Sequence, residues 1–152
     1  MSLHSELASV FPTIVVECPH EKPLFANEIA AILNQRMGSF FKGVFAKDEI
    51  NNTPTEFPGA YIVNSDPRCL PGSHWLAIYN NNQGISTYFD VFGIPPQEEE
   101  IIEFLNRSGT WQYSNIIYSS ISANSCGHYC MSFLLEASQL DLMQQFEINL
   151  IL

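Results

Sequence analysis

The chain has 152 residues, 46% of them hydrophobic, and carries 16 acidic against 6 basic residues, a formal net charge of -10 at pH 7. This length and apolar content predict one domain over residues 1–152 that is large enough to bury a core. The negative charge argues against nucleic acid and anionic lipid as partners, because their phosphates would be repelled. No apolar run is long enough to span a membrane.

The predicted elements mix helices and strands without internal repeats or a linker. Residues 13–16 are compatible with a short strand, apolar residues recur at helical spacing from Phe25 to Met37 and stop at Gly38, and residues 59–64 are β-prone. Further along, the pattern predicts strands over 74–79 and 85–91, a helix over 97–106 and a strand over 112–118. These elements indicate an α+β domain.

Two helices are expected near the end of the chain. One begins at Cys126 and runs through an apolar stretch, and a separate short helix covers residues 141–152. Leu142, Met143 and Phe146 are among the apolar residues that are expected to pack this second helix against the core.

The strands 74–79 and 85–91 flank turn-forming residues and predict a hairpin. With the turn centred on Asn82, Tyr79 faces Ile85 and His74 faces Asp90. Directly opposed Cβ atoms lie roughly 4.5–5.5 Å apart, within reach of a hydrogen bond between a carboxylate and an imidazole. A shift of one residue would place the two side chains on opposite faces of the sheet. The hairpin therefore predicts a His74–Asp90 pair.

Cys126 and Gly127 open the predicted buried helix. Unpaired N–H groups and the partial positive charge of a first helical turn favour a thiolate and supply donors to an oxyanion, while glycine allows close approach of a carbonyl. Taken alone, such a cysteine is more often a small buried hydrophobic residue, so its partners decide the interpretation.

A zinc site at Cys126, His128 and Cys130 is disfavoured. Positions two apart on a helix point to different sides, and structural zinc sites usually start with two cysteines separated by two to four residues. No metal is expected. Four cysteines, at 18, 69, 126 and 130, are too few and too unevenly spaced for a disulfide scaffold, and residues 1–10 lack the pattern of a secretory signal. An intracellular protein is expected.

Three spaced motifs carry a family resemblance. Gly-Ser-His74-Trp75, then Tyr-Phe-Asp90-Val-Phe-Gly93, then Ser-Cys126-Gly127-His-Tyr-Cys-x-x-Phe-Leu resemble the adenovirus-type maturation proteases, the adenain-like cysteine peptidases. The residues of these motifs are most similar to those of the proteases encoded by Maverick/Polinton transposons and virophages. Matching segments at 41–45 and 57–65 extend the resemblance, which runs from about residue 39 to 135. Ubiquitin-like-protein proteases share the fold and the order of the motifs, but the residues within each motif match less well.

The resemblance implies a papain-like or adenain-like fold with a central, mostly antiparallel sheet packed by helices. It also implies that Cys126 is the nucleophile, His74 the general base and Asp90 the residue that orients the base. Trp75, next to the base, either packs in the core or offers a ring face to the imidazolium. No cofactor is implied.

The oxyanion hole is where the sequence departs from the family. The backbone N–H of Cys126 would supply one donor. The family places a glutamine six or seven residues before the cysteine as the second donor, and those positions are Ser120 and Ser119 here. We expect Ser119, Asn124 or a water molecule to substitute, or the enzyme to be slow or degenerate.

Three functions remain open at this point. The first is an endopeptidase that matures viral or transposon capsid precursors, cutting after small residues such as glycine. The second is a protease for ubiquitin-like conjugates, and the third is a catalytically weakened peptide-binding module, which the replacement of glutamine by Ser119 favours. The resemblance places the protein in the host cytoplasm or nucleus, or packaged in virions, as a monomer acting on a polypeptide. The adenovirus enzyme is stimulated by DNA, and the acidic charge of this chain argues against the same activation here.

Overall fold

The computed structural model describes residues 25–66, 74–116 and 126–151, so the predicted strand at 13–16 lies outside the described residues. Its elements, in chain order, are α2 (Ala26–Met37), the 3-10 helix η2 (Gly38–Phe40), β1 (Phe41–Ala46), α3 (Lys47–Ile50), β2 (Gly59–Asn64), β3 (Trp75–Asn80), β4 (Ile85–Phe89), α4 (Glu99–Ser108), β5 (Thr110–Tyr113) and α5 (Cys126–Ile151). The architecture is α+β, as the sequence predicts.

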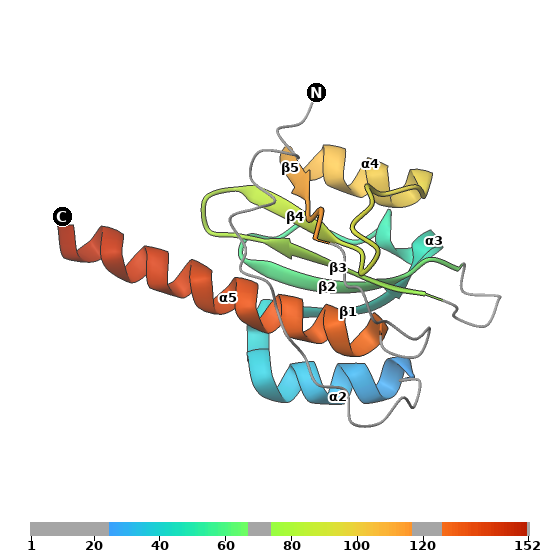
Figure 1. Ribbon diagram of the computed structural model, residues 1–152, viewed down its shortest axis with the longest axis horizontal. Helices are drawn as coiled ribbons and strands as arrows, with labels where there is room; N and C mark the ends of the chain where they lie inside the picture. The colour runs from blue at the N-terminus through green and yellow to red at the C-terminus, as the bar shows by residue number, and fades with distance from the viewer. Residues whose placement is uncertain (1–24, 67–73, 117–125, 152) are drawn as a thin grey trace.

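The five strands form one sheet in the order β1-β2-β3-β4-β5. The two central pairs, β2–β3 and β3–β4, are antiparallel, whereas β1–β2 and β4–β5 are parallel. The sheet is therefore mixed rather than mostly antiparallel. Helices α2 and α5 lie on one face, and α3 and α4 lie on the other (Figure 1).

The core has two layers, one on each face of the sheet. Ile29 and Leu33 of α2 pack with Phe133 and Leu134 of α5 on one face. Ile50 of α3 packs with three buried residues of α4 on the other, namely Ile101, Phe104 and Leu105. All six residues of β2 are buried, because this strand has helices on both faces.

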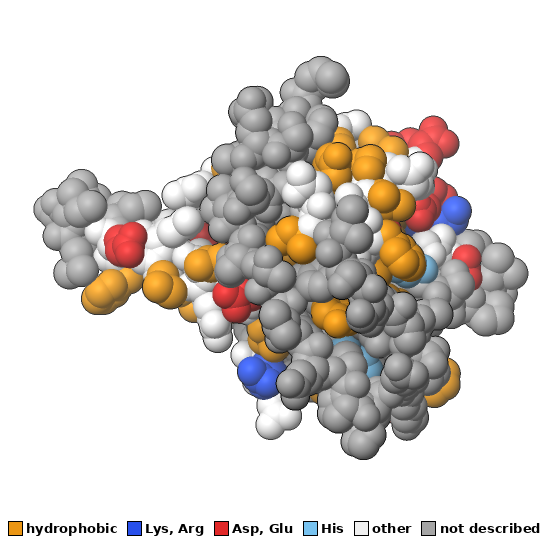
Figure 2. All heavy atoms as spheres, viewed as in Figure 1, with side chains coloured by type: hydrophobic (Ala, Val, Ile, Leu, Met, Phe, Trp, Pro, Cys, Tyr) orange, Lys and Arg blue, Asp and Glu red, His pale blue; other side chains and the backbone are white. Residues whose placement is uncertain are grey.

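Helix α5 is a single helix of 26 residues, so the prediction of a separate helix over 141–152 is wrong. From His128 to Ile151 the sequence contains neither glycine nor proline, and nothing in it interrupts the helix. The expected packing of Leu142, Met143 and Phe146 is also wrong, because all three side chains are exposed. The end of α5 runs beyond the sheet, and hydrophobic side chains lie along it (Figures 1 and 2).

None of the helices in the described ranges is long and apolar enough to cross a membrane.

The predicted hairpin exists, but its register differs by two residues. Tyr79 pairs with Thr87 and not with Ile85. The strands meet at a turn that Gly84 closes with a φ of 81°, where the N–H of Asn81 donates to the carbonyl of Ile85 at 2.9 Å. Because side chains alternate with a period of two, a shift of two residues keeps every side chain on its predicted face.

Candidate active site

His74 and Asp90 lie just outside the strands that carry them. His74 precedes β3 and Asp90 follows β4, so the two residues are not a cross-strand pair. The side chains nevertheless meet, with His74 Nε2 and Asp90 Oδ1 3.0 Å apart. The carbonyl of His74 accepts a 2.9 Å hydrogen bond from the N–H of Ser65, which fixes its backbone at the end of β2. The predicted pair forms, although the predicted register does not.

Backbone donors hold the Asp90 carboxylate in place. Its Oδ1 atom accepts a 2.9 Å hydrogen bond from the N–H of Phe92 as well as the one from His74. The Asp90 carbonyl accepts the N–H of Gly93 at 2.8 Å, and the positive φ of 68° at this position favours glycine. The Asp-x-Phe-Gly sequence thus forms a tight turn that aims a buried carboxylate at the imidazole.

Cys126 is the first residue of α5, and its side chain is buried. Its thiol is hydrogen-bonded with the His74 side chain. Because Nε2 is engaged by Asp90, Nδ1 is the imidazole nitrogen left for the sulfur. The imidazole therefore lies between the carboxylate and the thiol, and the structure brings together the three side chains that the sequence singles out.

The electrostatics of the site favour an ion pair between Cys126 and His74. Burial lowers the pKa of His74, but hydrogen bonds to Asp90 and Cys126 and the charges of both outweigh it and raise the pKa to about 9. Burial raises the pKa of Cys126, but the hydrogen bond with His74 and backbone N–H groups of Trp75 and Gly127 lower it below its ordinary value. Both shifts act in the same direction, because each favours the charged form of its group and so the thiolate–imidazolium pair over the neutral pair.

An aromatic ring that the sequence argument did not single out covers His74. The ring of Phe92 stacks on the imidazole, with centroids 5.3 Å apart and an interplanar angle of 25°. Trp75 is partly buried and packs against the core cluster to which α5 contributes. The Asp-x-Phe-Gly motif could have indicated this contact, because the turn that it forms places the phenylalanine next to His74, the residue that Asp90 contacts.

The peptide group of Trp75 lies between two cysteines. Its N–H donates to the sulfur of Cys126, and its carbonyl accepts a 3.3 Å hydrogen bond from the thiol of Cys130. Cys130 has no exposed surface, and burial, followed by the charges of Cys126 and Asp90, raises its pKa well above the ordinary value. Cys130 therefore remains a neutral donor that holds the Trp75 peptide plane.

No group of three His, Cys, Asp or Glu side chains that could hold a metal ion occurs among the described residues. In the Cys126, His128 and Cys130 set, the Nδ1 atom of His128 is buried without a hydrogen-bond partner, and burial lowers the pKa of this imidazole. The remaining cysteines, at positions 18 and 69, and the oxyanion candidates Ser119, Ser120 and Asn124 lie outside the described residues. Their roles stay predictions.

A clamp far from Cys126 holds α5 on the hairpin. The buried carboxylate of Asp141 accepts hydrogen bonds from the hydroxyl of Tyr79 at 2.8 Å and from the backbone N–H and side-chain Nδ2 of Asn82, at 3.1 and 2.9 Å. Because Tyr79 belongs to β3, the clamp fixes the helix that carries Cys126 against the strand that follows His74.

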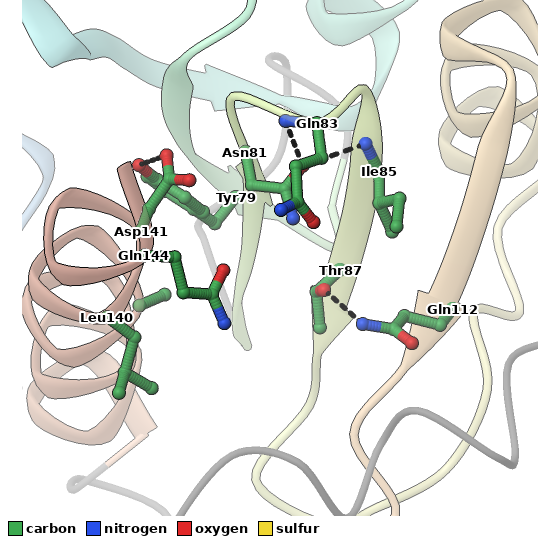
Figure 3. A pocket seen from close by; sticks show the side chains of 10 residues that line it. Tyr79, Asn81, Gln83, Ile85, Thr87, Gln112, Leu140, Asp141 and Gln144 are labelled. Carbon is green, nitrogen blue, oxygen red and sulfur yellow. Dashed lines mark hydrogen bonds between the residues drawn. The ribbon is translucent and has the colours of Figure 1, made fainter. Parts of the chain in front are cut away.

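A pocket of about 180 Å³ adjoins this clamp, between α5 and the strands β3 to β5 (Figure 3). Leu140 and Gln144 of α5 face Thr87 and Gln112 across it, and Gln112 donates to Thr87 at 2.9 Å (Figure 3). The helical residues that line it follow Cys126 by three turns or more, which is more than about 15 Å along the axis. The pocket is separate from the His74 site.

No protein-family model matches the sequence, and neither does any curated protein. Solved structures do match. The crystal structure of the ASFV pS273R protease has a TM-score of 0.60 at 17% sequence identity, covering 80% of this chain and 59% of that chain. A selenomethionine form of the same protease has a TM-score of 0.51 at 17% identity, covering 80% and 60%. The chain thus spans about three fifths of these neighbours and shares their fold.

Proposed function

We propose that the chain is a cysteine endopeptidase. The observation that carries this proposal is the position of His74, which is hydrogen-bonded to Asp90 on one side and to Cys126 on the other. The lowered pKa of the Cys126 thiol at a helix N-terminus raises the fraction of thiolate, which is the nucleophilic form. The structural neighbours, which are proteases, support the same chemistry.

The geometry fits a two-step acyl transfer. The Cys126 thiolate attacks the scissile carbonyl carbon and forms a carbon–sulfur bond, which gives a tetrahedral oxyanion. When this intermediate collapses, the carbon–nitrogen bond breaks and the His74 imidazolium gives its proton to the leaving amine. Water then attacks the thioester, its proton passes to His74, and the carboxylic acid product leaves with the thiolate restored. Asp90 holds the imidazole throughout.

The first turn of α5 supplies oxyanion donors. Residues at a helix start have N–H groups without intrahelical acceptors, and the backbone N–H of Cys126, the first residue of α5, is the proposed first donor to the oxyanion. Gly127 lets a substrate carbonyl approach, since it has no side chain above the turn. Ser119 is the proposed second donor.

Capsid-precursor processing in viruses or transposons is the substrate class that we favour. The motifs around His74, Asp90 and Cys126 resemble those of adenovirus-type proteases in sequence. The structural neighbour, from ASFV, is also a protease. Cleavage of ubiquitin-like conjugates is the second candidate, because proteases of that class place the same residues in the same order. Either role is consistent with an intracellular monomer that acts on polypeptides.

A binding module without turnover is the third candidate, and the serine at the oxyanion position favours it. Incubation of the purified chain with a peptide library and with ubiquitin-like precursors separates the three. Cleavage that is lost in Cys126→Ser and His74→Ala supports the peptidase, and the nature of the cleaved substrates distinguishes the first two roles. Binding of peptides without cleavage by any form would contradict the peptidase.

Brief iodoacetamide treatment near neutral pH tests the nucleophile separately. Cys126 should be carboxamidomethylated first among the four cysteines, because of the two that the structure describes it is the one with both a helix N-terminus and a histidine partner. Preferential labelling of Cys130, which is buried and protonated, would contradict the assignment of Cys126.

A further inference from the structure

Phe92 has a position that the triad chemistry leaves unexplained. Its side chain is 52% exposed, yet it stacks on the imidazole of His74. We propose that Phe92 forms one wall of a subsite for the residue directly after the cleaved bond, and that this subsite takes large apolar or aromatic side chains. The inference rests on the proposed peptidase function and names part of its substrate class.

The ring is coupled rigidly to the catalytic groups. The N–H of Phe92 donates to the Asp90 carboxylate at 2.9 Å, and this oxygen also accepts His74 Nε2 at 3.0 Å. The following residue, Gly93, closes the turn onto the Asp90 carbonyl at 2.8 Å. A substrate group resting on the Phe92 ring is therefore held at a fixed place relative to the imidazole.

Exposure alone would not mark a binding site, because single apolar residues are common on protein surfaces. Phe146, at the far end of α5, is exposed to 65% and is an example. Phe92 differs because one face of its ring contacts the base while the side chain as a whole stays half-open to solvent. Ile94, two residues on, is also exposed, so the apolar surface continues along the same turn.

The direction of the reaction identifies which half of the substrate lies here. The leaving amine takes its proton from His74, so its nitrogen must come within about 3 Å of the imidazole. The acyl half stays bonded to the sulfur of Cys126, whereas the residue that carries the leaving amine lies on the side of His74. The side chain of that residue starts two bonds from the amine nitrogen, which places it within reach of the Phe92 ring, whose centroid is 5.3 Å from that of the imidazole.

The chemistry of the wall selects the side chain. An aromatic ring favours apolar contacts and stacked or edge-on rings. A basic side chain at this place would be repelled by the imidazolium that carries the proton for the leaving amine. Leucine, methionine, phenylalanine and tyrosine are therefore favoured directly after the cleaved bond, over glycine, lysine and arginine.

The test uses a mixed peptide library digested by the full chain, with cleaved bonds identified by mass spectrometry. Wild type should show the apolar preference at the position after the cut. Phe92→Ala should reduce kcat/KM for an aromatic residue relative to glycine by about tenfold or more, since lost apolar contacts in a pocket discriminate on this scale. Phe92→Tyr should keep the preference, and Phe146→Ala is the matched control that should not alter it.

A second measurement guards against misfolding of the alanine variant. Phe92→Leu keeps an apolar side chain of similar bulk but has no ring to stack, and it should shift selectivity from aromatic towards aliphatic residues. If Phe92→Ala and Phe92→Leu cleave with unchanged selectivity, the subsite is refuted while the peptidase stands. If Cys126-dependent cleavage is absent from wild type, the peptidase and the subsite fall together.

Discussion

Replacing Asp90 by asparagine tests how the site keeps His74 charged. An asparagine has the same shape, and its carbonyl oxygen can still accept the hydrogen bonds that Asp90 Oδ1 accepts from His74 and Phe92 at 3.0 and 2.9 Å. The geometry should therefore survive while the negative charge disappears. Any change in titration then reports electrostatics rather than loss of the turn.

The size of the effect follows from the pKa of His74. Its rise from 6.5 to about 9 corresponds to about 3 kcal/mol in favour of the imidazolium, and the His74 side chain is only 23% exposed, so solvent screens little of it. Asp90 and Cys126 share this stabilisation. If Asp90 supplies about half or more, Asp90→Asn lowers the pKa of His74 by roughly one to two pH units.

The pH dependence of kcat/KM measures this change, because the step that releases the amine needs the imidazolium. For wild type, kcat/KM should decrease on the alkaline side with a midpoint near pH 9. For Asp90→Asn, the midpoint of this decrease should lie roughly one to two pH units lower. The exposed residue Asp48 offers a control with the same change of charge, and Asp48→Asn should leave the midpoint in place. An unchanged midpoint in Asp90→Asn would refute the account of how His74 stays charged.

Four further outcomes are expected. Cys130→Ala should lower the free energy of unfolding by about 1–2 kcal/mol in urea titrations, and it should slow alkylation of Cys126 at neutral pH. Cys130→Ser is the control, because its hydroxyl should keep the hydrogen bond to the Trp75 carbonyl. Asp141→Asn should cost roughly 1–3 kcal/mol of unfolding free energy, because a buried charged acceptor is lost from the clamp. The pKa of His74 is raised in the folded protein, so the contribution of its charge to the free energy of unfolding is complete below pH 6.5 and disappears as pH rises through about 9. The difference in unfolding free energy between wild type and His74→Gln should therefore shrink over that range. Ser119→Gln should raise kcat by roughly ten- to a hundredfold with little change in KM, measured on a cleaved library peptide.

The sequence predicted the pairing of His74 with Asp90 although its predicted register was wrong. The turn closes at Gly84 in a left-handed conformation, so the strands pair two residues away from the expected alignment. The error was harmless because side chains alternate with a period of two, and a shift of two preserves the face. A shift of one residue would have separated the imidazole from the carboxylate.

Features that depend on the extent of packing could not be predicted from local patterns. The apolar residues Leu142, Met143 and Phe146 suggested a packed helix, but α5 runs past the sheet and leaves them exposed. Where the sheet ends relative to α5 depends on the tertiary arrangement, which the spacing of apolar residues does not contain. The stacking of Phe92 on His74 was missed because it arises from the Asp90 turn and not from a periodic pattern.

The serine in place of glutamine decides between a weakened enzyme and a binding module, and two variants separate them. A serine side chain is shorter than glutamine, so at the oxyanion position its hydroxyl needs a bridging water where an amide would donate directly. If water already fills that role, Ser119→Ala changes little and Ser119→Gln raises kcat, because the new donor acts on charge that appears only in the transition state. Loss of turnover in Ser119→Ala, with no gain from Ser119→Gln, would show instead that the hydroxyl is itself the donor. If neither variant nor wild type cleaves while Cys126 still reacts rapidly with iodoacetamide, the thiolate–imidazolium pair exists without a working oxyanion hole, and the binding module becomes the better account.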